Sequence, residues 1–371
     1  MAQLAPAPSL GTLAAVGAQQ QALAKLEVLE EAAEAAAIRR KSNGALRRAV
    51  KAWKRGDVVR AGQLSLEATD TDPKNAPAFH VLGMALEKMG HQHKALVTYE
   101  HAYALDPEDP ELLINLGLTA WNLKMRDGAA KMFRLFIAAC PNSPLGYNNL
   151  GSIQCDMGQE TTAIETLRGA ILRMPAETML WNSLATVLAE VGRAEESLVF
   201  YQEAIRLDPG FSRPYHNLGY AFQHLGRLEE ALEAYDHALE RAIDESEQRE
   251  GKHSRSICLI GMGRLQEGFR EYEIRNEQRF RAYVHHMTKA PAWKGEPLDG
   301  KRILVIGEQG LGDEFMFANI LPDLQKAVGP SGKLQIAVDK RLVPLFARSF
   351  PQADVGEYDD RQLIDPDGRK E

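Results

Sequence analysis

The chain has 371 residues, of which 44% are hydrophobic and 26% are charged, the balance of an ordinary soluble protein long enough for two or three domains. Its 44 basic and 51 acidic residues give a net charge of −7 without a long basic run, which excludes nucleic acid and an anionic membrane surface as expected partners. No apolar stretch approaches the roughly 20 residues that span a bilayer, and the N-terminus lacks a signal-peptide pattern, so we expect a cytoplasmic protein.

The N-terminal segment, residues 1–41, divides into two parts. The first twelve residues carry proline and glycine, and we expect no regular structure there. Residues 13–41 are rich in alanine, leucine, glutamate and glutamine, the composition of a helix.

A repeat of 34 residues then dominates the chain. Five prolines keep this step: Pro73, Pro107, Pro141, Pro175 and Pro209. A column of small residues keeps it too: Gly83, Gly117, Gly151, Ala185 and Gly219. A column of large residues follows sixteen positions later: Tyr99, Phe133, Leu167, Tyr201 and Tyr235. Small residues let two helices approach closely, large ones fill the space beside them, and a proline ends the second helix.

These columns resemble the tetratricopeptide repeat, a pair of antiparallel helices. We count six units over residues 42–245, beginning at Ser42, Ala76, Pro110, Pro144, Thr178 and Ser212. After a polar insertion, "DESEQREGKHSRS", residues 246–282 contain a degenerate seventh unit that we interpret as a cap. The resemblance implies a mostly α superhelix whose first helices line a groove that binds protein segments.

Polar and aromatic side chains recur at the positions that should line this groove. The residue before each landmark leucine is an asparagine in three units: Asn115, Asn149 and Asn217. Other candidates are His80, Asn148, Asn182, His216, Trp121 and Tyr220. The asparagines resemble the ladder in the repeats of O-linked N-acetylglucosamine transferases, where amides can hold a peptide backbone. The alternative is that they solvate the groove or bond to the neighbouring helix.

The periodicity changes after the repeats. Prolines and glycines mark a linker at residues 283–300. Residues 301–371 then alternate between expected strands and helices: "KRILVIG", a helix over 313–328, "KLQIAVD", a helix in "KRLVPLFARSF" and a strand in "ADVGEY". This order predicts the first part of an open, parallel α/β sheet.

The loop "GEQGLGDEF" after the first of these strands admits several interpretations. A dinucleotide fingerprint requires a third glycine where Phe315 stands, and a Walker-type phosphate loop requires a lysine that is missing. The run from Trp293 to Pro322 instead resembles the junction of bacterial proteins that fuse tetratricopeptide repeats to a GT-B glycosyltransferase, some of which are similar to flagellin-modifying enzymes. Asn319 stands where relatives often have arginine, so an anion contact there is not expected.

This resemblance implies roles for the loop residues. Asp313 would be the base that takes a proton from the acceptor hydroxyl, or else only a helix-capping carboxylate. Glu308, Gln309, Gly310 and Gly312 would shape the acceptor side of the interdomain cleft. No metal site is expected, because the three cysteines have no zinc-binding spacing and the histidine pairs lack carboxylate or thiol partners.

The resemblance also implies that the GT-B module is incomplete here. About 70 residues follow the linker, fewer than one ordinary domain contains. The half that holds the nucleotide-sugar donor is absent, so we expect no cofactor in this chain and little activity from it alone. Two hypotheses follow: a repeat domain that recruits a protein acceptor for a glycosyltransferase, and a non-enzymatic adapter with a vestigial α/β tail.

Overall fold

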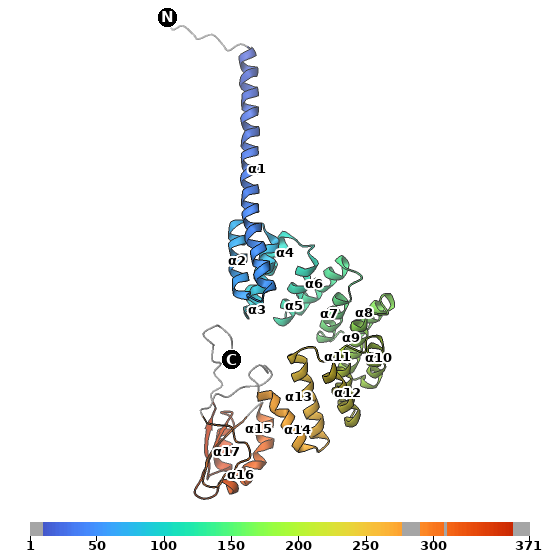
Figure 1. The fold of residues 1–371 in the computed structure, drawn as a ribbon, viewed down its shortest axis with the longest axis vertical. Coiled ribbons are helices and arrows are strands. Elements are labelled where there is room, and N and C mark those ends of the chain that lie inside the picture. Colours follow the sequence, from blue (N-terminus) through green and yellow to red (C-terminus); the bar gives the residue numbers. More distant parts are fainter. Residues whose placement is uncertain (1–9, 277–289, 308–309, 359–371) are drawn as a thin grey trace. The chain divides into compact units, whose positions relative to one another are not determined.

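The computed structural model describes residues 10–276, 290–307 and 310–358. The chain divides into two compact units, Met1–Leu207 and Asp208–Glu371 (Figure 1), each of which is described by itself. Within the described residues, none of the helices combines the length and the apolar character needed to cross a membrane.

The first unit consists of helices that pair in chain order. They are α1 (Leu10–Lys54), α2 (Val58–Thr71), α3 (Ala76–Lys88), α4 (Gln92–Leu105), α5 (Pro110–Asn122), α6 (Arg126–Ala139), α7 (Pro144–Asp156), α8 (Glu160–Arg173), α9 (Thr178–Glu190) and α10 (Ala194–Leu207). The first helices α3, α5, α7 and α9 begin at the residues where the 34-residue period places them. Because Pro110 and Pro144 stand at the start of α5 and α7, they remove amides that would lack a partner in any case.

The repeats continue in the second unit. They form α11 (Ser212–His224), α12 (Leu228–Arg241), α13 (Glu245–Gly261), α14 (Leu265–Tyr272) and a short 3-10 helix, η1 (Glu273–Asn276). The predicted fold class, mostly helical repeats followed by a small parallel sheet, is confirmed.

Two columns of the repeat meet inside each helix pair. A Cβ atom added to Gly83 would lie 2.5 Å from the ring of Tyr99, and one added to Gly117 would lie 2.6 Å from the ring of Phe133. These rings are fully buried. The glycine column therefore marks where the first helix passes directly over the large side chain of the second, at a distance that leaves no room for a methyl group.

A third column lies in the turn between the two helices of each unit. It is glycine with a positive φ of 70° to 83° at Gly56, Gly90, Gly158, Gly192, Gly226 and Gly263. In the third repeat Lys124 occupies this position with φ 65°. A left-handed conformation costs a residue with a Cβ atom about 1 kcal/mol or more, so this turn is strained where the others are not.

We therefore expect Lys124→Gly to stabilise the protein. Glycine adopts the same φ without the steric cost, and part of the gain is lost to the larger entropy of the unfolded chain, so the free energy of unfolding should rise by about 0.5–1 kcal/mol. Chemical denaturation followed by circular dichroism measures the change. The control is Lys131→Gly, which places the same substitution inside α6 and should destabilise it.

The boundary expected between residues 41 and 42 falls inside a helix, because α1 runs without interruption from Leu10 to Lys54 and serves as the first helix of the first repeat. The polar stretch "DESEQREGKHSRS" forms most of α13, which begins at Glu245 behind the cap residue Asp244, whose side chain accepts a hydrogen bond from the Glu247 amide. Helix α13 thus pairs with α14 as a complete seventh unit.

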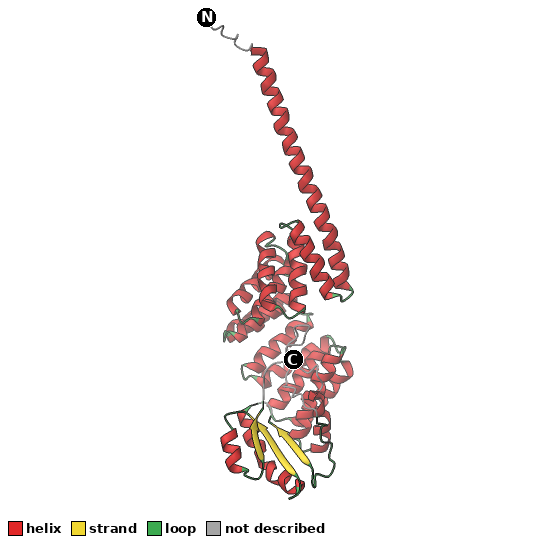
Figure 2. Ribbon diagram, turned by 90° about the vertical axis from the view of Figure 1, so that its left-hand side faces the viewer, coloured by secondary structure: helices red, strands yellow, loops and turns green. Residues whose placement is uncertain are grey.

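The C-terminal segment forms a three-stranded parallel sheet (Figure 2). The strands β1 (Arg302–Ile306), β2 (Lys333–Val338) and β3 (Asp354–Glu357) lie in the order β1-β2-β3, with Ile303 opposite Leu334 and Ile336 opposite Val355. Leu334, Ile336 and Val338 point into a small core with Leu321 and Phe346. The connecting helices are α15 (Leu311–Phe317), η2 (Ala318–Ile320), α16 (Leu321–Val328) and α17 (Val343–Ser349).

The helix expected over residues 313–328 is therefore two helices with a 3-10 turn between them. Pro322 lies in the first turn of α16. Since a proline ring clashes with the carbonyl four residues earlier, a continuous α-helix through this point would be costly. Residues 283–289 of the expected linker lie outside the described residues.

Candidate functional site

The first helices of the first unit present one face that is partly exposed. On α5, α7 and α9 this face consists of residues at intervals of three and four, which fall on one side of a helix. We call these residues the first-helix stripe: Glu111, Asn115, Leu118 and Asn122 on α5, Leu145, Asn149, Ser152 and Asp156 on α7, and Met179, Ser183, Thr186 and Glu190 on α9. Apart from the central Asn149 and Ser183, all of them are at least partly exposed.

Several residues of this stripe take part in hydrogen bonds between successive repeats. The Asn115 amide nitrogen lies 2.9 Å from Nε2 of His80, one repeat earlier. The other ring nitrogen of His80 lies 3.2 Å from a carboxylate oxygen of Asp109, which also caps α5 by accepting a bond from the Glu111 amide. If Asn115 donates its N–H to Nε2, the histidine proton is on Nδ1 and is donated to Asp109.

A second group of hydrogen bonds joins the fourth and fifth repeats. The Ser183 hydroxyl, which has one proton to donate, lies within hydrogen-bond distance of the Asn148 side-chain oxygen and of the Met179 carbonyl oxygen, at 2.7 Å from the latter. Asn148 in turn donates its amide to the Asn149 oxygen, at 3.1 Å. Asn149 is only 7% exposed, and among the described residues its amide nitrogen has no hydrogen-bond partner. Asn182 is also buried.

At the C-terminal ends of the same helices, side-chain hydrogen bonds again join successive repeats. The Trp121 indole donates to the Asp156 carboxylate at 2.6 Å, and the Cys155 thiol donates to Glu190 at 3.2 Å. Burial, and then the Glu190 carboxylate, raise the pKa of Cys155 to about 12. This thiol is therefore protonated at neutral pH and is not a nucleophile.

These contacts bear on the interpretation of the asparagines. Asn115 bonds to His80 of the preceding repeat, which agrees with the alternative that the asparagines bond to the neighbouring helix, whereas the buried amide nitrogen of Asn149 has no partner among the described residues. Sequence reasoning named these residues but missed their partners. The signal was available, because each bonded pair is separated by 35 residues, one repeat plus one position.

The second unit carries the remaining groove candidates. His216 on α11 lies 3.0 Å from the Ser254 hydroxyl on α13, again across a repeat boundary. Tyr220 is 51% exposed, and its ring lies 4.3 Å from that of His224. Asn217 is half-buried. Of these residues, Tyr220 is the one most available to a ligand.

The burial of His216 predicts a pH dependence of stability. Burial lowers its pKa from the ordinary value near 6.5, although Asn217 and Glu250 oppose the shift and Arg213 adds to it. At His216 the unfolded chain then binds a proton more readily than the folded chain. The free energy of unfolding therefore has its full value above about pH 6.5 and declines as the pH falls toward the pKa of the folded state.

We expect the melting temperature to fall between pH 7 and pH 5, and His216→Gln to reduce this fall by removing the buried imidazole. The control is His224→Gln, which changes an exposed histidine on the same helix and should leave the pH dependence as it is in the wild type. Equal pH profiles for the wild type and His216→Gln would contradict the assignment.

The loop after β1 is described only in part, since Glu308 and Gln309 lie outside the described residues. Gly310 precedes α15 with φ 128°, and Gly312 and Asp313 are exposed in the first turn of the helix. Gly310 is the cap residue of α15, and among the described residues no side-chain hydrogen bond caps the helix, so the alternative role of Asp313 as a capping carboxylate is not borne out.

The neighbouring carboxylate, Glu314, was missed. It is 6% exposed and accepts hydrogen bonds from the Asp339 amide at 2.9 Å and from the Tyr358 hydroxyl at 2.8 Å. It also lies against Gly307, where a Cβ atom would approach within 2.6 Å. Glu314 thus joins the carboxyl ends of all three strands. Helical spacing was the signal, because Glu314, Ala318 and the buried Leu321 share one face.

The loop is followed by exposed apolar side chains. Phe315, Met316, Phe317 and Ile320 are 64%, 56%, 56% and 49% exposed. Exposed large apolar side chains that follow one another so closely in the chain are typical of an interaction surface.

Comparison with known proteins places these features in context. Residues 76–109, 180–211 and 200–233 match family models described as "Tetratricopeptide repeat". A crystal structure of a tetratricopeptide-repeat protein from Parabacteroides merdae is similar to 63% of this chain and 91% of its own, with a TM-score of 0.55 and 13% identity, which shows the shared fold. A crystal structure of YrrB, described as having an unusual peptide-binding site, covers 49% of this chain and 94% of its own, with a TM-score of 0.35 and 21% identity.

One curated relative matches most of the chain. Protein FlbA of Caulobacter vibrioides is 37% identical over 310 residues, which are 84% of this chain and 52% of FlbA. The chain therefore spans about half the length of this relative.

Proposed function

Because the chain is a tetratricopeptide-repeat protein, we propose that its repeats bind a protein segment and recruit it as the acceptor of a GT-B-type glycosyltransferase. The observation that carries the binding part is the first-helix stripe, an accessible row of side chains on helices that are held in register by hydrogen bonds between repeats. Such rigidity lowers the entropy cost of binding an extended segment.

The chemistry of the stripe suggests the kind of segment. Leu118 and Leu145 supply apolar contact, while Glu111, Asp156 and Glu190 are acidic and exposed. An extended segment with small apolar side chains and some basic residues would complement it. The name of the relative FlbA suggests a flagellar setting, and flagellin is accordingly our candidate acceptor.

For sugar transfer we assign Asp313 as the base that deprotonates the acceptor hydroxyl. Its side chain is exposed at the carboxyl edge of the parallel sheet, the edge at which open α/β folds bind ligands. A nucleotide-sugar donor would be held by a second half-domain, as in the GT-B enzymes that this chain resembles.

One observation favours the alternative of a non-enzymatic adapter. Among the described residues, no hydrogen bond orients the carboxylate of Asp313, whereas a general base is normally held in place by a partner. In that case the repeats alone would carry the function, and the α/β segment would serve only as an interaction surface.

Binding is tested with purified flagellin from the organism that encodes the chain. We expect Leu145→Arg to weaken its affinity about tenfold or more, because it removes an apolar contact and places a cation on the stripe. The matched control is Leu172→Arg on the second helix α8, where the leucine is 84% exposed and lies outside the stripe. Equal affinities for the two variants would reject the stripe as the binding surface.

Transfer is tested separately, on a gene product that includes the donor half. Asp313→Asn should abolish sugar transfer while leaving flagellin binding intact. An unchanged rate would exclude Asp313 as the base and favour the adapter, without bearing on the binding result.

A further inference from the structure

The exposed side of α15 and η2 carries three large apolar side chains. Met316, Phe317 and Ile320 are 56%, 56% and 49% exposed. Residues three or four apart lie on the same side of an α-helix, and residues three apart eclipse in a 3-10 helix, so these side chains share one side. We call them the apolar row. The opposite side packs on the sheet through the buried Glu314 and Leu321.

The apolar row continues directly from Asp313. The exposed carboxylate of Asp313 precedes Met316 by three residues and Phe317 by four, so it lies on the same side of the helix. The α-helix rises about 6 Å from Asp313 to Phe317, and the 3-10 turn rises about 6 Å more to Ile320. An extended polypeptide covers this length with about four residues. A segment whose hydroxyl lies at Asp313 would therefore place its nearby side chains on the apolar row.

The size of the apolar row fits a short segment rather than a second domain or a second copy. Three side chains that are about half exposed offer on the order of 300 Å² of apolar surface. A stable interface between two folded proteins buries about 800 Å² on each partner. An extended segment with one or two apolar side chains needs no more surface than the row provides.

The chemistry of the apolar row argues against the nucleotide-sugar donor as its ligand. A diphosphate loses its hydration beside apolar side chains without gaining hydrogen bonds, and the carboxylate of Asp313 repels it. Apolar side chains of a polypeptide, by contrast, gain free energy when they leave water and contact the row.

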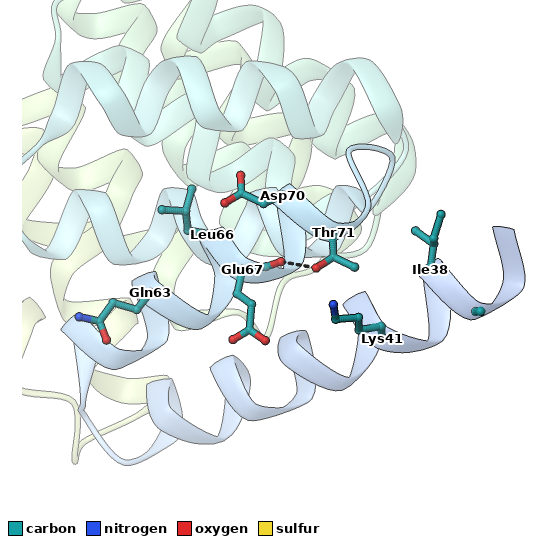
Figure 3. A pocket seen from close by; sticks show the side chains of 8 residues that line it. Ile38, Lys41, Gln63, Leu66, Glu67, Asp70 and Thr71 are labelled. Carbon is teal, nitrogen blue, oxygen red and sulfur yellow. Dashed lines mark hydrogen bonds between the residues drawn. The ribbon is translucent and has the colours of Figure 1, made fainter. Parts of the chain in front are cut away.

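Another exposed apolar surface lies in the hollow between α1 and α2 (Figure 3). Its volume is about 760 Å³, and Ile38 and Leu66 line it together with Lys41, Glu67 and Asp70. The hollow contains no residue with an assigned chemical role, and nothing in the described part of the chain indicates what would fill it. The apolar row adjoins the residue to which we assign the transfer step, so the row is the surface with an identifiable ligand.

We propose that the apolar row binds large apolar side chains of the acceptor, within about four residues of the hydroxyl that receives the sugar. Because Asp313 locates that hydroxyl, this proposal rests on the proposed function. The acceptor class is a segment in which leucine, isoleucine, valine or methionine lies close to a serine or threonine. Phe317, between the other two members of the row, contributes most of the preference.

The test measures the binding of synthetic peptides to this chain by fluorescence anisotropy. Short peptides with one central serine carry either leucine or glutamine three residues before it or three residues after it. The wild type should bind the better leucine peptide about tenfold more tightly than its glutamine counterpart, the effect of burying one aliphatic side chain. Phe317→Ser should bring this ratio close to one.

Phe269→Ser is the matched control. Phe269 is 54% exposed, close to the 56% of Phe317, and lies on α14 rather than on the apolar row. This variant should keep the preference of the wild type for leucine. Because both phenylalanines are exposed, the circular dichroism of the two variants should match that of the wild type.

Equal affinities of the wild type for the leucine and glutamine peptides, or a preference that survives Phe317→Ser, would overturn the proposal. A dimeric wild type that Phe317→Ser dissociates in sedimentation equilibrium would also overturn it and assign the row to a second copy. A gene product that includes the donor half but lacks the preference would assign the row to that half.

The proposed function is judged by a different variant. Flagellin binding that Leu145→Arg weakens, in a protein without a leucine preference, would reject this inference and leave the proposed function standing. Flagellin binding that Leu145→Arg leaves unchanged would count against the proposed function, whatever the peptides show.

Discussion

Replacing Phe133 by alanine is expected to lower the free energy of unfolding by about 3–5 kcal/mol, the range for truncating a fully buried aromatic ring. The ring has no exposed surface, lies directly beneath Gly117 and meets Trp121 edge-on with ring centroids 6.3 Å apart. Its removal leaves a cavity between α5 and α6, and close packing prevents the surrounding helices from filling it.

Urea denaturation monitored by circular dichroism measures this loss. In a repeat array each unit contacts mainly its neighbours, so the third repeat should unfold at a lower urea concentration than the others and broaden the transition. Phe269→Ala is the control, because that phenylalanine is 54% exposed and should cost far less. A loss below about 1 kcal/mol for Phe133→Ala would show that the ring is not the centre of the repeat.

Replacing Gly117 by alanine is expected to lower the free energy of unfolding by about 1–3 kcal/mol, the usual cost of overpacking a core. The added Cβ atom would lie 2.6 Å from one ring carbon of Phe133 and 3.0 Å from another, so the helix or the ring must move. The loss occurs even though alanine is the better helix former, which makes its sign informative.

Gly128→Ala is the matched control. It makes the same chemical change inside α6, where an added Cβ atom would meet no other atom within 4 Å. Because Gly128 lies in the first turn of α6, replacing it by alanine should stabilise the protein by at most about 0.5–1 kcal/mol. If Gly117→Ala and Gly128→Ala shift the unfolding midpoint in the same direction, the close approach at Gly117 is not what the structure indicates.

The helix pairs could be predicted from the sequence because the same pattern of small residues, large residues and prolines recurs every 34 residues. Small residues at the crossing point, large residues beside them and prolines after the second helix specify where each helix must begin and end. The second helices α2, α4, α6, α8, α10 and α12 accordingly begin 34 residues apart.

Errors arose where a boundary rested on the period alone. Residues 40–42 contain no helix-breaking residue, so nothing in the local chemistry ends α1 before the first repeat begins. The polar stretch from Asp244 to Ser256 adds three residues to the period, since α14 begins 37 residues after α12, but its composition did not indicate that it is helical. A helix that contacts its neighbours on one side only needs few apolar residues, and Asp244 supplies a cap that starts it.

The candidate site was less predictable, because tertiary contacts decide which polar side chains are free. Asn115 bonds to His80, a position that the third, fourth and fifth repeats fill with isoleucine or asparagine, so its partner could not be inferred from the asparagine column alone. In the first turn of α15, Asp313 and Glu314 are adjacent carboxylates in different surroundings. Asp313 is exposed, whereas Glu314 is buried and accepts hydrogen bonds at the strand ends. Composition cannot separate them, whereas the helical spacing to Leu321 does.

The most direct measurement of the central claim is site-specific photo-crosslinking to flagellin. A benzophenone amino acid placed at Leu145 on the first-helix stripe should form a covalent adduct with flagellin, and the same residue placed at Leu172 on α8 should form none. An adduct from Leu172 but not from Leu145, or from neither position at concentrations where the two proteins bind, would contradict the account.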